Sequence, residues 1–284
     1  MLVRALRLHN WLKNILVFVP AILAKAVDAA TFRTLVLAWL AFGCAASAQY
    51  LLNDFLDKEH DQHHAEKEKR PQVTGELPAR AAVGIALALL VGGTVCAAWL
   101  PAGSQLALAS YLFLCLAYSL LLKRVLMIDV LTLVAVNDLR LAAGACAASI
   151  ALSPPLLLAG SFAFLAMALL KRDAQLTGAT DDSQRLMVGR PYRRHHLPIL
   201  RTLTGVAIAA SVLLATLVIH ELTEQAARPQ ALWFILPLLG AWLCRCLFLA
   251  VRRALSEDLV IFVCTDRYSL ITLGGSVLLL IVAG

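Results

Sequence analysis

Nine long apolar segments recur along the chain, and they limit its fold more than any other feature. A helix of about 20 apolar residues spans the roughly 30 Å hydrocarbon core of a bilayer. Such a helix also satisfies its own backbone hydrogen bonds, as a segment surrounded by lipid must. We therefore predict an all-α, polytopic membrane bundle of nine transmembrane helices, at approximately 14–31, 33–53, 80–100, 104–122, 126–148, 153–170, 199–220, 231–251 and 268–283.

The composition agrees with this interpretation, because 61% of the 284 residues are hydrophobic and only 15% are charged. We interpret residues 1–284 as a single transmembrane domain. Two of the predicted spans contain small residues that let helix backbones approach closely. These residues are Ala41, Gly43, Ala45, Ala46 and Ala48, and Ala142, Ala143, Gly144, Ala145 and Ala147.

The distribution of Lys and Arg predicts the orientation of the bundle, because cytoplasmic loops carry an excess of these residues. One set of loops holds most of them, whereas the other set holds only Lys25, Arg33 and Arg228. This alternation predicts a cytoplasmic N-terminus, an outer C-terminus and a multi-pass protein of the inner (plasma) membrane. The predicted cytoplasmic loops lie at about 54–79, 123–127, 171–198 and 252–267.

The net charge of +7 follows from this topology and does not indicate a nucleic-acid partner. Proteins that bind nucleic acid interleave basic residues with stacking aromatics, and no soluble segment here does so. The cysteines lie in or beside apolar spans without a Cys-x-x-Cys pair, so we interpret them as small buried hydrophobes. They are Cys44, Cys96, Cys115, Cys146, Cys244, Cys246 and Cys264.

A group of oxygen-bearing side chains lies where the second apolar segment meets a polar loop. Asn53, Asp54, Asp57 and Asp61 are three or four residues apart, so one face of a helix would carry all four. Carboxylates this close repel one another unless a hard cation lies between them, and Mg²⁺ prefers such oxygen ligands. The pattern predicts a Mg²⁺ site facing a phosphorylated substrate; the alternative is a solvated acidic helix start.

Two ionisable residues, Asp138 and Arg140, interrupt the fifth apolar segment. A charged side chain that faces lipid costs several kcal/mol, so both are expected to face the interior of the bundle. On the functional interpretation, Arg140 projects into a polar cavity and contacts a substrate phosphate. On the structural interpretation, it pairs with Asp138 or a backbone carbonyl, and the role of Asp138 itself stays open.

Several segments together resemble the UbiA superfamily of intramembrane prenyltransferases. Members share nine transmembrane helices and an Asn-Asp-x-x-Asp-x-x-x-Asp motif, which residues 53–61 match completely. Other segments are similar to one branch of it, the polyprenyl-phosphate (decaprenyl-phosphate type) phosphoribosyltransferases. These segments are Arg7 to Asn14, Tyr118-Ser119 through Lys123-Arg124 to Asp129, Leu139-Arg140 through Gly144, Lys171-Arg172, Gly189-Arg190-x-Tyr192, and Asp258 to Arg267.

This resemblance implies transfer of 5-phosphoribosyl from phosphoribosyl diphosphate to a membrane polyprenyl phosphate, with release of diphosphate. It implies catalytic Asp54, Asp57 and Asp61 holding Mg²⁺ together with Asn53, at a site that faces the cytoplasm. Lys and Arg side chains would bind donor and lipid phosphates, and a homo-oligomer is compatible with it. The implied substrate-binding residues are Asn53, Lys13, Tyr118, Lys123, Arg140, Lys171, Arg172, Asp173, Arg190 and Tyr192.

One departure keeps alternatives open. Superfamily members that prenylate aromatic acceptors have a second Asp-x-x-x-Asp motif after the sixth helix, where this chain has Asp173, Asp181 and Asp182 without that spacing. Asp173 is the nearest candidate for a second metal-facing group, and Gln175 offers only a neutral amide. The main alternative is therefore an aromatic prenyltransferase that uses a prenyl diphosphate donor and an acceptor such as 4-hydroxybenzoate. A transporter is a further alternative, although its outer loops would be expected to carry more charge.

Overall fold

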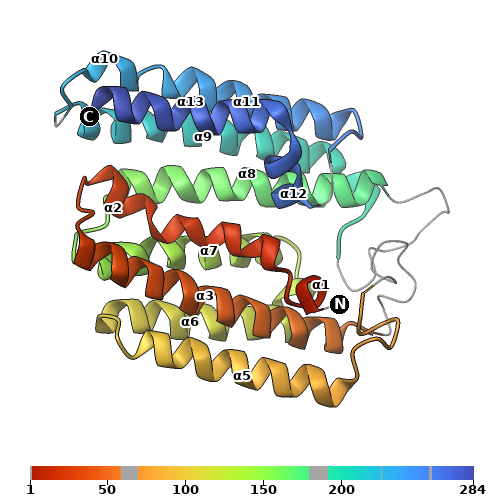
Figure 1. Ribbon diagram of the computed structural model, residues 1–284. Coiled ribbons are helices and arrows are strands. Elements are labelled where there is room, and N and C mark those ends of the chain that lie inside the picture. Colours follow the sequence, from red (N-terminus) through yellow and green to blue (C-terminus); the bar gives the residue numbers. More distant parts are fainter. Residues whose placement is uncertain (1, 59–69, 179–190, 225, 256–257) are drawn as a thin grey trace. The chain divides into compact units, whose positions relative to one another are not determined.

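The computed structural model describes residues 2–58, 70–178, 191–224, 226–255 and 258–284, and every element in them is a helix (Figure 1). The predicted all-α fold class is thus confirmed. The chain forms two compact units: unit 1 is Met1–Val125 with Leu139–Leu152, and unit 2 is Leu126–Asp138 with Ser153–Gly284. Each unit is described by itself.

Unit 1 is built around the long helix α3 (Ala29–Leu56), against which α5 (Ala79–Ala97), α6 (Ala102–Leu120) and the 3-10 helix η1 (Leu8–Val17) pack. Its other elements are α1 (Leu2–Leu6), α2 (Val19–Leu23), η3 (Leu122–Arg124) and the second part of α7 (Ile128–Ala147).

Unit 2 contains the start of α7. Within this unit, α8 (Pro154–Gly178) packs along α9 (Leu197–Thr223). The helix α11 (Ile235–Val251) contacts α8, α9 and α13 (Arg267–Ala283). The shorter elements are η4 (Arg194–His196), α10 (Pro229–Leu232) and α12 (Leu259–Thr265), which meets α13 at an angle of 75°.

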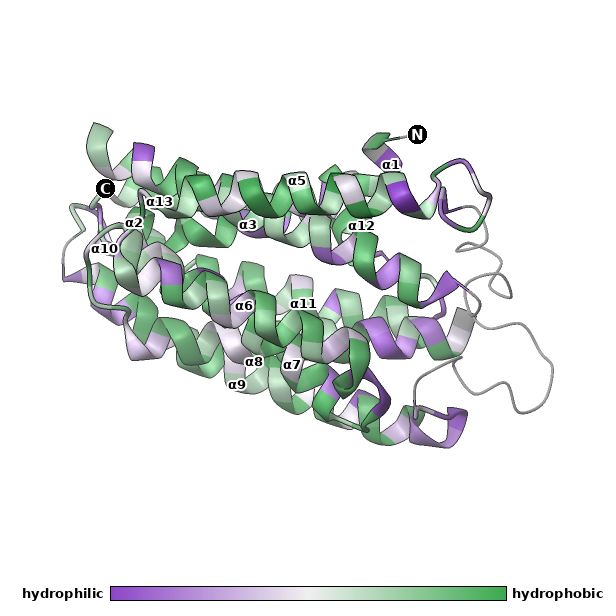
Figure 2. Ribbon diagram, turned by 90° about the horizontal axis from the view of Figure 1, so that it is seen from below, coloured by the Kyte–Doolittle hydropathy of each residue, from purple (hydrophilic) through white to green (hydrophobic). Residues whose placement is uncertain are grey.

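Seven helices of the described residues are long and apolar enough to cross a membrane, and the bent pair α12 and α13 would make an eighth span. Figure 2 shows apolar residues along the long helices and polar residues gathered near helix ends. The chain is therefore a membrane protein with several transmembrane helices. Eight of the nine predicted apolar segments coincide with these helices.

The first predicted segment, 14–31, differs from the prediction because it does not form one long helix. The 3-10 helix η1 ends at Val17, α2 ends at Leu23, and α3 already begins at Ala29. Pro20 lacks the N–H that a continuous helix would use. Lys25 has a φ of 53°, a left-handed conformation that stops helical propagation.

The small residues predicted to allow close approach do so within unit 1. A Cβ added at Gly43 would lie 2.7 Å from the Trp11 ring, and one at Gly144 would collide with the Val17 carbonyl. The neighbouring alanines are buried as well, except Ala142, which is half-buried. η1 can therefore lie directly against both α3 and α7.

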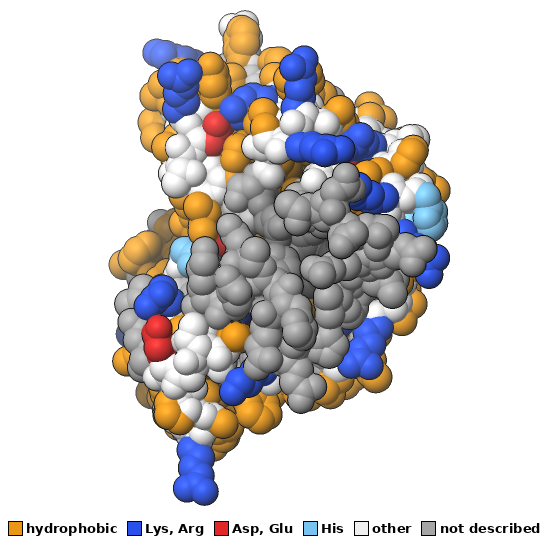
Figure 3. Space-filling model, turned by 90° about the vertical axis from the view of Figure 1, so that its right-hand side faces the viewer, with side chains coloured by type: hydrophobic (Ala, Val, Ile, Leu, Met, Phe, Trp, Pro, Cys, Tyr) orange, Lys and Arg blue, Asp and Glu red, His pale blue; other side chains and the backbone are white. Residues whose placement is uncertain are grey.

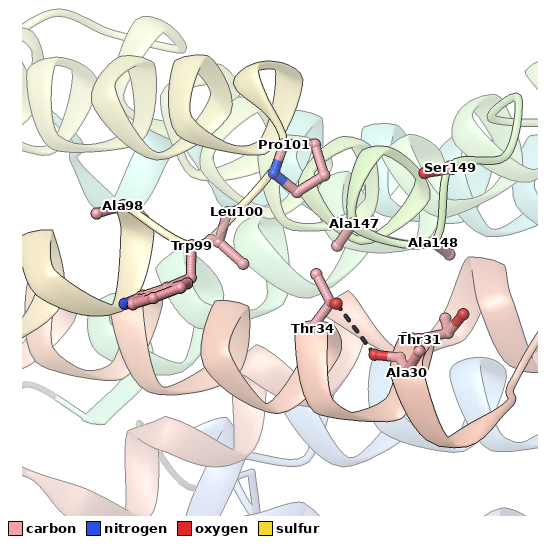
Figure 4. Close-up of a pocket in the computed structure, with 10 residues that line it drawn as sticks. All are labelled: Ala30, Thr31, Thr34, Ala98, Trp99, Leu100, Pro101, Ala147, Ala148 and Ser149. Atoms are coloured by element: carbon pink, nitrogen blue, oxygen red, sulfur yellow. Dashed lines mark hydrogen bonds between the residues drawn. The ribbon is translucent and has the colours of Figure 1, made fainter.

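A cavity of about 560 Å³ opens in unit 1 beside the start of α3 (Figure 4). Thr31, Thr34, Trp99, Pro101 and Ser149 line it together with small apolar residues, and its lining includes no ionisable side chain. Asp54 lies 23 residues further along α3 than Thr31, or about 35 Å at 1.5 Å per residue. This cavity thus belongs to the opposite end of α3 from the acidic motif.

Candidate functional site

The acidic motif lies at the C-terminal end of α3, where its side chains pair with basic residues. We call Asn53, Asp54, Asp57, Arg7, Arg70 and Lys123 the α3 carboxylate cluster. Arg7 and Arg70 both donate to Asp54 Oδ1, at 2.5 and 3.0 Å. Lys123 Nζ lies 2.5 Å from Asp57 Oδ1. The Asn53 amide donates to Asp57 Oδ2 at 3.1 Å, as the predicted helical spacing of four residues requires.

Asp54 is buried, whereas its two partners reach the surface of the unit. The Asp54 side chain is 2% exposed, and those of Arg7 and Arg70 are each 21% exposed. The described cluster has two carboxylates and three basic groups, so its formal charge is −2 + 3 = +1. A group of this sign attracts phosphorylated molecules even before a metal is considered.

The N-terminal segment is anchored on α3, and this anchor places Arg7. Ser47 donates to the Leu6 carbonyl at 2.7 Å and accepts from the Trp11 indole at 2.9 Å. Arg7 itself has a φ of 49° between α1 and η1, and its guanidinium lies 5.0 Å from the centre of the Tyr50 ring. These contacts hold the guanidinium over the end of α3.

The chemistry of the cluster fits a hard divalent cation, because Asn53, Asp54 and Asp57 supply amide and carboxylate oxygens. Asp61, the fourth predicted ligand, lies outside the described residues. Among the residues that the structure describes, no group of three or more His, Cys, Asp or Glu side chains could hold a metal by itself. In this structure, the guanidinium groups of Arg7 and Arg70 and the ammonium group of Lys123 bind the carboxylate oxygens, and they supply positive charge as a metal ion would.

Three further predicted residues of unit 1 lie on α7, η1 and α6. Arg140 is 3% exposed; its Nε donates to Asn14 Oδ1 at 2.8 Å and its Nη2 to the Tyr111 hydroxyl at 3.1 Å. Arg140 therefore faces the interior, as expected. Lys13 is half-buried on η1, next to Asn14, and Tyr118 is half-buried near the end of α6.

A second group, which we call the Asp129 network, lies in unit 2 and consists of Asp129, Arg172, Tyr192 and Gln175. Arg172 Nε donates to Asp129 Oδ2 at 2.7 Å, the Tyr192 hydroxyl donates to Asp129 Oδ1, and Arg172 Nη1 donates to Gln175 at 2.6 Å. The side chains of Asp129 and Arg172, and the residue Tyr192, are 0% exposed. The predicted substrate-binding residues Arg172 and Tyr192 thus bind an internal carboxylate.

The pKa of Tyr192 is raised well above its ordinary value, first by burial and then by its hydrogen bond to Asp129 and by the negative charge of that residue. The phenol consequently keeps its proton, and it also accepts from the Met127 backbone N–H at 3.2 Å. Tyr192 therefore connects the start of α7 to the segment that precedes α9.

The remaining predicted residues of unit 2 lie around the end of α8. Asp173 is 1% exposed, and Arg201 of α9 donates to both of its oxygens at 2.6 and 3.2 Å. Lys171 is half-buried and lies two residues before Asp173 on the same helix. The predicted residue Arg190 and the alternatives Asp181 and Asp182 lie outside the described residues.

Sequence reasoning did not select Arg7, Arg70 or Asp129 as site residues. Arg7 and Arg70 are 47 and 16 residues away from Asp54 in the chain, so no local spacing relates them. The available signals were the Arg70-Pro71 turn and the position of Asp129 at the start of an apolar span. Most of the charged side chains visible in Figure 3 are Lys and Arg.

The comparisons with known proteins agree with this fold. A model of the UbiA prenyltransferase family matches residues 14–263, so the chain belongs to this family, which is a family of membrane transferases. The structure of a UbiA homologue from Archaeoglobus fulgidus bound to GPP and Mg²⁺ has a TM-score of 0.74 and 18% identity, covering 98% of each chain. The predicted resemblance is thereby confirmed at the level of the family and the fold.

Three curated relatives are more similar in sequence. An uncharacterised Sinorhizobium fredii protein is 31% identical over 93% of this chain, which spans only 52% of that relative's length. The nodulation protein NoeC of Azorhizobium caulinodans is 30% identical, covering 95% of this chain and 89% of its own. A decaprenyl-phosphate phosphoribosyltransferase of Mycolicibacterium smegmatis is 33% identical, covering 73% of this chain and 67% of its own.

Proposed function

We propose that this protein transfers the 5-phosphoribosyl group from phosphoribosyl diphosphate to a polyprenyl phosphate in the membrane. Support comes from the relative that is named a decaprenyl-phosphate phosphoribosyltransferase and from the sequence segments that resemble this branch. The named nodulation relative covers more of this chain, and its name specifies no substrate.

The proposed reaction needs positioning and charge neutralisation more than acid–base chemistry. An oxygen of the acceptor phosphate, already anionic near neutral pH, forms a bond to the anomeric carbon as the bond from that carbon to diphosphate breaks. Mg²⁺, when bound, would neutralise the leaving diphosphate. The protein supplies oriented cations and carboxylates that hold the reacting groups.

The proposed roles follow the chemistry of each side chain. Asp54, Asp57 and Asp61, with Asn53, would hold Mg²⁺. Basic residues would contact phosphate oxygens: Lys123, Lys171 and Arg190 those of the donor, and Lys13 and Arg140 that of the lipid. Tyr118 would contact substrate directly. We assign Arg172, Asp173 and Tyr192 a positioning role instead, because each is bound to a charged partner inside unit 2.

One observation favours this function over prenyl transfer to an aromatic acceptor. The resemblance implies a second acidic motif after the sixth helix in aromatic prenyltransferases, and Asp173 is the candidate in the described part of that region. Arg201 binds this carboxylate at 2.6 Å. The candidate carboxylate is thus already neutralised within unit 2.

We also propose the finer topology predicted from the sequence: one domain, nine spans, a cytoplasmic N-terminus and an outer C-terminus in the inner (plasma) membrane. The segment from η1 to α2 would be the additional, interrupted span before the eight found by length and composition. The concentration of Lys and Arg in alternate loops supports an active site that faces the cytoplasm.

A paired assay tests the function. Membranes containing the protein are incubated with Mg²⁺ and either labelled phosphoribosyl diphosphate plus polyprenyl phosphate, or labelled prenyl diphosphate plus 4-hydroxybenzoate. We expect label in the lipid fraction from the first mixture, and loss of this label when EDTA replaces Mg²⁺. A labelled product from the second mixture alone would contradict the proposal and favour the aromatic prenyltransferase.

A further inference from the structure

The double ion pair of Asp54 has a consequence for how metal and diphosphate bind. One oxygen, Oδ1, accepts from Arg7 at 2.5 Å and from Arg70 at 3.0 Å. Mg²⁺ would have to approach a ligand oxygen to about 2.0–2.1 Å. Two guanidinium groups at this oxygen would repel the ion and block part of its approach. Oδ1 therefore cannot hold both arginines and the metal in this geometry, and an ion at the other oxygen, Oδ2, would still be repelled by the two nearby guanidinium charges.

We propose that Asp54 is bound either by Arg7 and Arg70 or by the metal ion. Binding of diphosphate would switch Asp54 from the arginines to the metal. Diphosphate oxygens would accept the two guanidinium groups, which match phosphate geometry well. Asp54 would then be released to bind the divalent cation. This inference rests on the proposed function, because it uses the same cluster, and it adds Arg7 and Arg70 as diphosphate-binding residues.

The burial and the backbone positions of the three residues fit such an exchange. Asp54 is 2% exposed on α3, whereas each arginine side chain is 21% exposed and lies outside the long helices. Arg7 lies between α1 and η1, and Arg70 precedes Pro71 in a turn. The arginines can therefore change partners by side-chain rotation while α3 stays in place.

The formal charge of the α3 carboxylate cluster predicts its relative affinities for diphosphate and for metal alone. The described members of the cluster sum to +1 before any ligand binds, and this charge favours a polyanion over a divalent cation. Metal alone should bind weakly, and metal and diphosphate should each strengthen the binding of the other by the same factor. Direct contact between diphosphate and the metal would also produce this coupling. The decisive quantity is therefore the affinity for metal alone when an arginine is removed.

Mn²⁺ binding to the full-length protein in detergent, followed by electron paramagnetic resonance, measures this quantity without any substrate. We expect Arg7→Gln and Arg70→Gln each to bind Mn²⁺ alone more tightly, on the order of tenfold, because a competing charge is lost. The same variants should bind inorganic diphosphate without metal more weakly by a similar factor. The control is Arg4→Gln, whose exposed partner Glu76 lies 3.6 Å away, and it should change neither affinity.

Unchanged or weaker Mn²⁺ affinity in the arginine variants would overturn the proposal, because the arginines would then only hold Asp54 in place. Each of the two variants keeps one arginine bound to Asp54. If one variant does not fold, the Mn²⁺ affinity of the other still tests the proposal. Sulfate supplies a second test in the unaltered protein: by drawing the arginines away, it should tighten Mn²⁺ binding, and no effect would count against the exchange. Neither test uses a sugar donor or a lipid, so failure here is distinguishable from failure of the proposed transfer reaction.

Discussion

The α3 carboxylate cluster and the Asp129 network use the same chemical groups in opposite surroundings. Asp54 and Asp129 are both buried, and each accepts from two donors: Arg7 and Arg70 in unit 1, or Arg172 and Tyr192 in unit 2. The partners of Asp54 are 21% exposed, whereas those of Asp129 are 0% exposed. Exposure of the partners, rather than of the carboxylate, separates the two groups.

This difference determines what each group can do. An arginine that reaches solvent can leave its carboxylate when another cation replaces it there, because water or a phosphate takes over the hydrogen bonds of the guanidinium. A fully buried arginine has no such replacement, so its carboxylate is needed for the fold. We therefore interpret the α3 carboxylate cluster as exchangeable and the Asp129 network as structural support. The following variants test this assignment, beginning with the largest expected effect.

Replacing Asp129 by Asn should have the largest effect on stability. Arg172 would lose the counter-charge of Asp129 in a site that is 0% exposed. Removal of one partner of a buried pair typically costs about 3–5 kcal/mol. The expected result is a strongly lowered melting temperature and yield in detergent. A melting temperature equal to that of the wild type would mean that Arg172 reaches another partner or solvent.

Replacing Asp54 by Asn should instead remove activity and preserve the fold. Arg7 and Arg70 can both be solvated, so the melting temperature should change little. Loss of a group that organises charge in the transition state typically lowers kcat by about 10²–10³-fold. Diphosphate release in the presence of phosphoribosyl diphosphate, polyprenyl phosphate and Mg²⁺ measures this change. Full Mg²⁺-dependent activity would refute the metal-binding role.

Sequence patterns predicted the fold far better than they predicted which residues pair with each other in the α3 carboxylate cluster and the Asp129 network. Apolar length placed eight of the helices, and helical spacing placed Asn53 beside Asp57. The interrupted segment before α3 was not predicted, because Lys25 adopts a left-handed conformation that nothing in its residue type requires. The partner of Arg172 is 43 residues away in the chain, and this pairing depends on tertiary packing that local patterns do not encode.

Replacing Tyr192 by Phe should have an intermediate effect within the Asp129 network. The variant removes the hydroxyl that donates to Asp129 and accepts from the Met127 backbone N–H. Leaving buried hydrogen-bonding groups unsatisfied costs about 1–3 kcal/mol. The melting temperature should therefore fall, but less than for Asp129→Asn. A fall as large as for that variant would show that the hydroxyl, and not the charge of Asp129, dominates.

The same tyrosine should produce a smaller, pH-dependent effect. Because its pKa is raised in the folded state, its contribution to stability is fully present below the unfolded pKa of about 10. As the pH rises beyond that value, the unfolded state loses this proton first, and the contribution declines. The melting temperature of the wild type should thus fall more steeply between about pH 10 and 11 than that of Tyr192→Phe. Parallel curves would assign the alkaline sensitivity to other groups.

The smallest effect on stability and activity is expected for an ion pair in which both side chains are exposed. The side chains of Arg4 and Glu76 are 65% and 44% exposed, and their charged atoms lie 3.6 Å apart. Pairs of this kind contribute about 0–1 kcal/mol, because water and salt screen the charges. Arg4→Gln should therefore leave both the melting temperature and the transferase activity nearly unchanged. A substantial loss of activity with an unchanged melting temperature would extend the phosphate-binding surface beyond the α3 carboxylate cluster to α1.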